Sequence, residues 1–505
     1  MTALAKNLAS MPADRLRGMR RGVEKESLRV RPDGRLALTP HPAVLGSPLT
    51  HPRVTTDFSE SQLELITGVH DSVDACEAEL TQIHQAVYRA LGDEMLWAAS
   101  MPCGLPADET IPIGRFGSSN VGRAKSVYRM GLGLRYGRRM QTISGIHYNW
   151  SLPGLGNAEY FGLIRNFRRH SFLLLTLFGA SPAVCPSFVA DRSHDLQRLS
   201  AHTLYMPHAT SLRMGRLGYQ SDAQAALGVS YNSLEEYAYS LVGALTRPHP
   251  PYEQFGLRGP DGEYVQLATS LLQIENEFYG TIRPKRVIHP GERPLRALLE
   301  RGVEYVEVRC MDLDPFEPVG IGADTMRALD LFLLHCLLSD SPDDSAQDIA
   351  RLASNQHLAA ARGREPGLQL ERHDGPIALI DWAQELLAEC RPIAAAVDAA
   401  LGGTAYAAAL DNAVSTMAVP AKLPAARVLD TMHRDFADSY TAFVNAQSAH
   451  TREALLSLPF ASDLAARFDA MARESLLAQQ RIEAADTLSF EDYRQQYLAP
   501  ERLGI

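Results

Sequence analysis

The sequence predicts an α+β protein, in which a largely antiparallel sheet packs one face against helices and a helical region follows at the C-terminus. Two observations predict this class. Short segments in the first two thirds of the chain alternate polar and apolar residues with the period of a strand, and they are rich in β-branched and aromatic residues. From about Ala323 the pattern becomes Ala- and Leu-rich and helical, which divides the chain into residues 1–322 and 323–505.

The first predicted strand, "RGVEKESLRV" at Arg21–Val30, carries two carboxylates two positions apart. On a strand Glu24 and Glu26 share one face, whereas on a helix they would point to nearly opposite sides. A solvated helix would give them no particular role. A strand that puts two carboxylates ahead of Leu28 and Val30 on one face costs free energy unless a cation neutralises them.

The next segment, "TTDFSESQLELITG", adds the candidate ligands Asp57 and Glu64. Their odd spacing would place them on opposite faces of one straight strand, so a turn or kink must separate them if both face the same site. For Asp57 alone, a turn or a helix cap is equally consistent with the residue type.

Three further segments have the same alternation: "SGIHYNWSL", "LLQIENEFY" and "VEYVEVRCM". Combined with the first strand, they predict a polar sheet face that holds Glu24, Glu26, His147, Asn149, Glu307 and Arg309, with Gln273, Glu275, Glu277 and Tyr279 on the "LLQIENEFY" strand. An ordinary half-exposed sheet would also show Glu and Arg, so one strand alone decides nothing. Four such strands with almost no Lys or Thr at the polar positions favour a functional face.

Helices are predicted at Ser72–Leu91, Ala158–Phe178, Ala383–Leu401 and Asp463–Ala485. The first begins at a serine and has apolar residues at heptad-like spacing. We expect residues 323–505 to form a helical layer that packs on the core formed by residues 1–322, without folding independently.

Composition excludes several classes of function. The chain has 505 residues, 46% of them hydrophobic and 21% charged, and a net charge of −10, which argues against broad nucleic-acid binding. The N-terminus lacks the apolar core of a signal peptide, and the apolar stretches are too short to span a bilayer, so we expect a cytoplasmic protein without membrane contact. The six scattered cysteines suggest buried thiols rather than disulfides or a structural zinc site, and His335 suggests a core histidine.

Oxygen donors beside a single imidazole suit Mg²⁺ or Mn²⁺, and clustered Mg²⁺ ions indicate a polyphosphate substrate. Gly117 and Gly122 have P-loop spacing but lack the following Lys and Ser/Thr, and "GLGLRYG" misses the dinucleotide pattern, so neither of these folds is predicted. Cationic partners for phosphate or carboxylate groups are available at Arg129, Arg135, Arg138, Arg139, Arg213, Arg283, Lys285 and Arg286.

Six collinear motifs resemble the proteobacterial type of glutamate–cysteine ligase. They are "RGVEKESLRV", "TTDFSESQLELIT", "MQTISGIHYNWSLP", "ATSLRMGRLGY", "LQIENEFYGTIRPKR" and "GVEYVEVRCMDLDPF". The resemblance runs from about Arg21 to Phe316 and continues more loosely through the helical region. It implies a fold similar to the catalytic domain of glutamine synthetase, with the antiparallel sheet curled into a funnel that binds Mg²⁺–ATP without a P-loop.

The resemblance also implies roles for individual residues. The implied metal ligands are Glu24, Glu26, Asp57, Glu64, His147 and Glu307. Arg309 would contact the transferring phosphate, and Arg213 would be a second anion-binding arginine. The implied substrate-binding residues are Phe58, Tyr128, Arg129, Asn149, Tyr219 and Tyr279, most of them around the cysteine substrate.

The activity implied by the resemblance is the ATP-dependent joining of the L-glutamate γ-carboxylate to the L-cysteine amine through γ-glutamyl phosphate, the first step of glutathione synthesis. Feedback inhibition by glutathione is also implied. The alternatives are a γ-glutamyl ligase for another amine, a guanidino-group phosphotransferase, or a non-catalytic Mg²⁺–nucleotide sensor.

Overall fold

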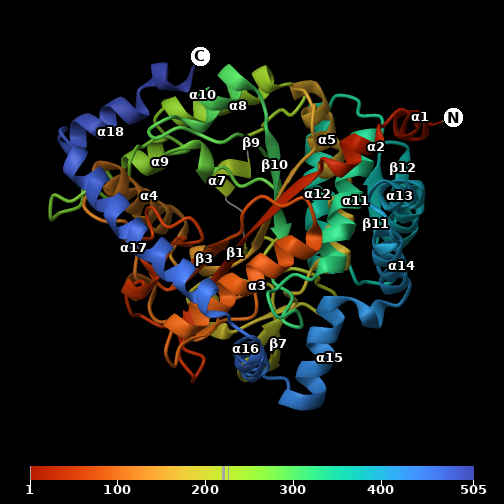
Figure 1. Ribbon diagram of the computed structural model, residues 1–505, viewed down its shortest axis with the longest axis horizontal. Helices are drawn as coiled ribbons and strands as arrows, with labels where there is room; N and C mark the ends of the chain where they lie inside the picture. Colours follow the sequence, from red (N-terminus) through yellow and green to blue (C-terminus); the bar gives the residue numbers. More distant parts are fainter. Residues whose placement is uncertain (1, 219–221, 226, 505) are drawn as a thin grey trace.

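The central element of the computed structural model is one antiparallel sheet (Figure 1). The structure describes residues 2–218, 222–225 and 227–504. The strands are ordered β2-β3-β1-β5-β10-β9, with the short β4 also paired to β1. Their bounds are Arg20–Val30 for β1, Val54–Thr56 for β2, Gln62–Ile66 for β3, Met95–Leu96 for β4, Ile146–Ser151 for β5, Ile282–Lys285 for β9 and Tyr305–Met311 for β10. The predicted antiparallel pairing is therefore confirmed.

Helices cover one face of this sheet. They are α3 (Val73–Ala90), α5 (Asn157–His170), α6 (Phe172–Phe178) and α11 (Ala323–Leu338), and the first three contact strands of the sheet directly. The apolar positions of the strands join these helices in the main hydrophobic core, which includes Val23, Tyr148, Val306, Val308, Ile83, Phe161 and Leu333. Because strand residues alternate between faces, the polar positions face away from this core.

The structure explains the order of residues along β1. Residues Arg20–Leu28 pair with β5 and β3, whereas Arg29 and Val30 at the end of the strand pair with β4. Leu28 and Val30 enter a second hydrophobic core with Trp97 and Ile143. The surroundings of the strand therefore change toward its end, which allows two carboxylates and two apolar residues on one face.

The predicted helices are observed with small adjustments. The Oγ of Ser72 accepts a hydrogen bond from the N–H of Ala75 at the start of α3, as the serine predicted. The predicted helix at Ala158–Phe178 is interrupted at Ser171, which ends α5 and precedes α6.

The strand predicted at "LLQIENEFY" is wrong. Glu275–Glu277 form a single 3₁₀ turn, and their carboxylates bind arginines away from the sheet. Glu275 contacts Arg293 at 2.7 Å, and Glu277 contacts Arg135 at 2.9 Å with both side chains fully buried. Glu277 Oε2 also accepts the backbone N–H of Gln273 at 2.7 Å. These buried charge pairs fix a turn that the alternation of residue types does not reveal.

Helices dominate the chain after Ala323, as predicted. They are α12 (Ala346–Arg362), α13 (Leu379–Leu401), α14 (Ala405–Ala418), α15 (Pro424–Phe436), α16 (Tyr440–Ser457), α17 (Ser462–Ala485) and α18 (Phe490–Leu498), with the hairpin β11–β12 (Gln369–Arg372 and Gly375–Ala378). α17 and α18 run along one side of the molecule, and α11, α13 and α14 pack together on the other (Figure 1). α11 packs on α5, α16 packs on α3, and Ser475 of α17 accepts the N–H of Ser47. Both parts of the chain therefore share one packed core.

The remaining helices and strands surround these layers. They are α1 (Ala3–Ala9), α2 (Ala13–Arg17), α4 (Asn120–Tyr136), α7 (Asp222–Ala225), α8 (Leu234–Thr246), α9 (Pro250–Glu253), α10 (Pro294–Arg301), and a second sheet of β6 (Ala183–Val184), β8 (Thr203–Tyr205) and β7 (Gln197–Ser200).

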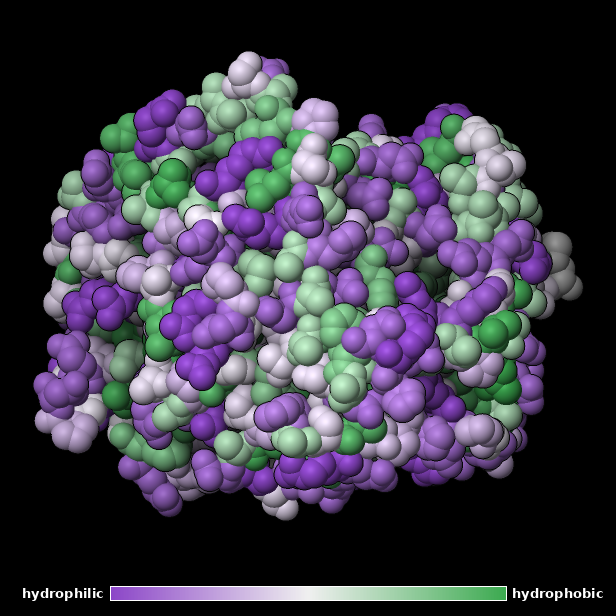
Figure 2. All heavy atoms as spheres, turned by 90° about the horizontal axis from the view of Figure 1, so that it is seen from below, coloured by the Kyte–Doolittle hydropathy of each residue, from purple (hydrophilic) through white to green (hydrophobic). Residues whose placement is uncertain are grey.

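The face of the molecule in Figure 2 mixes hydrophobic and hydrophilic residues at short intervals. Exposed large hydrophobic residues are scattered along the chain, for example Val69, Tyr239 and Val287. Within the described part of the chain, helices that combine the length and apolarity needed to cross a bilayer are absent.

Candidate active site

The register of the sheet gathers carboxylates on its polar face. Glu26 of β1 lies opposite Glu64 of β3, and Glu24 lies opposite His147 of β5. On the next pair of strands, Asn149 lies opposite Glu307 of β10. Directly opposed residues of antiparallel strands point to the same face, so five side chains of the predicted ligand set converge here.

His147 lies at the centre of the cluster. Its Nδ1 is 3.3 Å from Glu24 and 3.9 Å from Glu307, and its Nε2 is 3.7 Å from Glu26. Ligand atoms of Glu24, Glu64 and His147 all lie within 4.8 Å of one another. Glu26 and Glu307 are almost fully buried, while Glu24 keeps 22% of its side chain exposed, so the cluster opens to solvent at Glu24.

A hairpin brings Asp57 to the same face. Thr55 of β2 lies opposite Glu64 of β3, and Asp57 follows two residues later, just past the end of β2. The N–H of Asp57 donates to Gln62 O at 3.0 Å across the turn. The predicted turn between Asp57 and Glu64 is present, and it resolves their odd spacing.

Cations surround one end of the cluster. Glu307 lies 3.1 Å from Arg309, 3.3 Å from Lys285 and 3.9 Å from Arg283. Burial alone would raise the pKa of Glu307, but these charges hold the pKa well below its usual range. Glu307 is therefore ionised at neutral pH.

At the opposite end of the cluster, the carboxylates are not balanced by the positively charged groups near them. Burial, together with the charge of Asp57, raises the pKa of Glu26 to about 8. Burial and the nearby carboxylates of Glu24, Asp57 and Glu26 raise the pKa of Glu64 well above its ordinary value. Burial and the positive charge of Arg309 lower the pKa of His147, which keeps the ring neutral and able to bind a cation.

Arg213 is placed by a close contact with Gly145. The guanidinium is buried, and its Nη2 donates to Arg309 O at 2.8 Å. The N–H of Gly145 donates to Glu26 Oε2 at 2.7 Å, and a Cβ at Gly145 would overlap the Arg213 guanidinium. Gly145 therefore lets Arg213, Arg309 and Glu26 meet, and the sequence patterns did not single it out.

The aromatic residues predicted around the cysteine substrate gather beside the cluster. Phe58, Tyr128 and Tyr279 belong to the second hydrophobic core, and Gln141 donates to the Tyr279 hydroxyl at 2.8 Å. Arg129 donates to the backbone oxygen of Asp57. Tyr219 lies outside the described residues.

Asn149 lies closer to the carboxylates than to these aromatic residues. Its amide donates to Glu24 Oε1 at 2.9 Å, which orients that carboxylate.

Several predicted cationic partners bind protein groups elsewhere. Arg135 pairs with Glu277, while Arg138 and Arg139 donate to the backbone oxygens of Glu109 and Ala190. Conversely, Arg283 and Lys285, predicted only as general cationic partners, lie at the site. Their alternation along β9, opposite Glu307 and Tyr305, is the signal that identifies them.

Comparison with known proteins identifies a family whose sequences match this chain. The sequence model of the glutamate-cysteine ligase family matches residues 5–155 and 154–359. A glutamate–cysteine ligase of Azotobacter vinelandii is 49% identical over 96% of this chain and 95% of the relative, and one of Alcanivorax borkumensis is 46% identical over 95% and 96%.

Solved structures agree with the sequence relatives. A glutamate–cysteine ligase of Francisella tularensis, solved in complex with AMP, superposes with a TM-score of 0.91 and 36% identity, covering 96% of this chain and 98% of that one. A bifunctional glutathione synthetase of Pasteurella multocida shares the fold, with a TM-score of 0.68 and 24% identity, over 93% of this chain and 57% of that one.

The fold and these relatives define the class of the protein as a ligase enzyme. More particularly, the chain belongs to the glutamate–cysteine ligase family. The resemblance drawn from the six motifs is thereby confirmed.

Proposed function

We propose that the protein joins the γ-carboxylate of L-glutamate to the amine of L-cysteine with hydrolysis of ATP, giving γ-glutamylcysteine, ADP and phosphate. The observation that carries this proposal is the convergence of Glu24, Glu26, Glu64, His147 and Glu307 from four strands on one sheet face, beside Arg309. Polyphosphate chemistry depends on this combination of carboxylates and cations.

The residues present fit a divalent cation such as Mg²⁺ or Mn²⁺. His147 Nε2 is buried without a hydrogen bond to the described residues. Burial and neighbouring carboxylates raise the pKa values of Glu26 and Glu64, and a bound cation would offset both effects. We propose Glu24, Glu26, Asp57, Glu64, His147 and Glu307 as the ligands. When bound, the cation neutralises phosphate oxygens and orients the nucleotide.

We propose that Arg309 and Arg213 stabilise the charge that develops during transfer of the ATP γ-phosphoryl group to glutamate. Such transfer needs mostly positioning and charge neutralisation, and a guanidinium supplies both. The product γ-glutamyl phosphate must be kept from water until the cysteine amine attacks its carbonyl carbon and phosphate leaves.

We propose that Phe58, Tyr128, Arg129, Tyr219 and Tyr279 bind cysteine, because aromatic rings with hydroxyls can pack against a small substrate and hydrogen-bond it. Asn149 would contribute by orienting Glu24.

We further propose that the sheet forms the wall of a funnel-shaped site, similar to that of glutamine synthetase, and that residues 1–322 form the catalytic core on which residues 323–505 pack. The protein would act in the cytoplasm on small molecules, without nucleic acid or membrane partners, and glutathione would inhibit it by feedback.

The test is to incubate the protein with ATP, Mg²⁺, glutamate and cysteine and to identify the product by mass. We expect γ-glutamylcysteine and one ADP per dipeptide. A panel of other amines tests the identity of the acceptor. A larger turnover with another amine would identify that amine, rather than cysteine, as the acceptor substrate. ATP binding without glutamate-dependent ADP release would instead identify a nucleotide sensor.

A further inference from the structure

A second group of metal-type side chains lies on the helix-covered side of the sheet, away from the carboxylate face. His170 ends α5, and His335 and Cys336 lie near the end of α11. One ligand atom from each lies within 4.8 Å of the others. His335 and Cys336 are buried, and both histidines line a cavity of about 940 Å³ between α5, α11 and α13.

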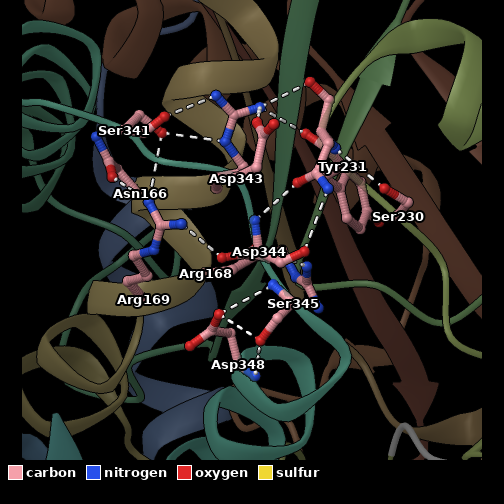
Figure 3. A network of polar contacts seen from close by, with 12 residues as sticks. Asn166, Arg168, Arg169, Ser230, Tyr231, Ser341, Asp343, Asp344, Ser345 and Asp348 are labelled. Atoms are coloured by element: carbon pink, nitrogen blue, oxygen red, sulfur yellow. Dashed lines mark hydrogen bonds and ion pairs between the residues drawn. The ribbon is translucent and has the colours of Figure 1, made fainter. Parts of the chain in front are cut away.

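The backbones that carry these residues are fixed to each other. The Asn166 amide, one turn before His170, donates to the carbonyl oxygens of Cys336 at 2.9 Å and Asp340 at 3.1 Å. Arg169 in turn donates to Asn166 Oδ1 at 2.9 Å and to Asp344 at 2.6 Å. Figure 3 shows Asn166 and Arg169 at the end of α5 and the contact of Arg169 with Asp344 in the segment after α11. The contacts of Asn166 and Arg169 therefore hold His170 close to Cys336 without any metal ion.

His335 has the surroundings of a metal-bound histidine. His335 Nε2 is 2.7 Å from the carboxylate of Glu389 on α13, which leaves Nδ1 as the free nitrogen. Nδ1 of His335 and Nδ1 of His170 are both buried without a hydrogen-bond partner among the described residues. Buried polar atoms are rarely left without partners, and a carboxylate on the second nitrogen is the usual support of a metal-bound histidine.

We propose that His170, His335 and Cys336 bind one Zn²⁺ ion, with a fourth position open to the cavity. Two imidazoles and a thiolate are the donors that zinc prefers, whereas Mg²⁺ prefers oxygen. Ligand atoms of a tetrahedral zinc ion lie about 3.5 Å apart. The three ligand atoms here lie within 4.8 Å of one another, so modest side-chain rotation brings them to that distance.

Binding forms two metal–nitrogen bonds and one metal–sulfur bond and releases the thiol proton of Cys336 to solvent. The two imidazoles bind as neutral rings through a nitrogen that carries no proton, so they release none. The ion would tie α5 to α11 beneath the sheet and so act on stability rather than on the reaction.

The test uses cobalt as a probe of the full-length protein, freed of metal by chelation and then supplied with excess Mg²⁺ to occupy oxygen-donor sites. We expect one Co²⁺ per chain, with a thiolate-to-cobalt band in the near ultraviolet and the strong visible bands of tetrahedral cobalt. One equivalent of Zn²⁺ should abolish them. Cobalt bound octahedrally by the carboxylates of the active site gives neither the thiolate band nor the strong visible bands. The cobalt spectrum therefore tests the zinc site independently of the ligase reaction.

Substitutions at the proposed ligands and their neighbours test which residues bind the cobalt ion. Cys336→Ser should lose the thiolate band, and the matched control Cys76→Ser, at a buried cysteine of α3, should keep it. If Cys336→Ser does not fold, Glu389→Gln is tested in its place. Because Glu389 supports His335, this variant should bind Co²⁺ about 10- to 100-fold more weakly. The proposal is overturned by a wild type without the band, by a band that survives Cys336→Ser, or by unchanged affinity in Glu389→Gln.

Discussion

Gly145 offers a sharp test of how the active site is assembled. An alanine Cβ at this position would lie 2.6 Å from Arg213 Nε, and closer still to two other guanidinium atoms, where ordinary contact begins at 3.4 Å. The Arg213 side chain is buried and donates to Arg309 O, so it cannot swing into solvent. Gly145→Ala must therefore displace Arg213, or the start of β5, by about 1 Å or more.

We expect three consequences of Gly145→Ala. Overpacking of this kind costs about 1–3 kcal/mol of unfolding free energy. Displacement by about 1 Å of groups around the transferring phosphate lowers turnover roughly 100-fold. The hydrogen bond from Gly145 N–H to Glu26 Oε2 lies on the same segment, so metal dependence should change as well.

The assay is dipeptide formation at saturating substrates, together with urea denaturation of the same preparations. Gly243→Ala is the matched control, because nothing lies within 4 Å of a Cβ there and the residue is inside α8. We expect the control to keep its turnover and to gain stability of up to about 1 kcal/mol. Wild-type turnover in folded Gly145→Ala would refute the close-packed arrangement of Arg213 and Arg309.

Three further predictions address other parts of the molecule. Arg309→Ala should lower turnover by about 100- to 1,000-fold while changing ATP affinity much less, and equal losses in both would argue against a role in the transition state. Glu307→Gln should raise the Mg²⁺ concentration for half-maximal activity at least about tenfold, and an unchanged requirement would remove Glu307 from the ligand set. Asp330→Ala should cost about 3–5 kcal/mol in urea denaturation, because it leaves Arg21, 3.0 Å away and fully buried, without its carboxylate; a loss below about 1 kcal/mol would contradict this.

Much of the sheet was predictable because β5 and β10 alternate between a polar and a core face. Glu24 and Glu26 on β1 and Glu307 and Arg309 on β10 occupy the positions that period-two alternation assigns to them. The match of His147 with Glu24 depends on strand register, which the sequence of one chain does not contain.

The failures have local physical causes. "LLQIENEFY" alternates like a strand, but Arg135 and Arg293 arrive from distant segments and neutralise its carboxylates in a turn. The role of Gly145 depends on a contact with Arg213 from another loop, and a single glycine before a strand carries no signal of that contact.

The grouping of His170 with His335 and Cys336 was equally hidden, because α5 and α11 meet only in the folded chain. His335 taken by itself had suggested an ordinary core histidine.

The most direct measurement for the whole account is the titration of Mn²⁺ into the protein, followed by electron paramagnetic resonance, for wild type and for Glu64→Gln. Glu64 shares its ligand group with Glu24 and His147, so the variant should bind Mn²⁺ at least about tenfold more weakly. Unchanged Mn²⁺ affinity in a folded Glu64→Gln protein would contradict the claim that these separate strands build one cation site.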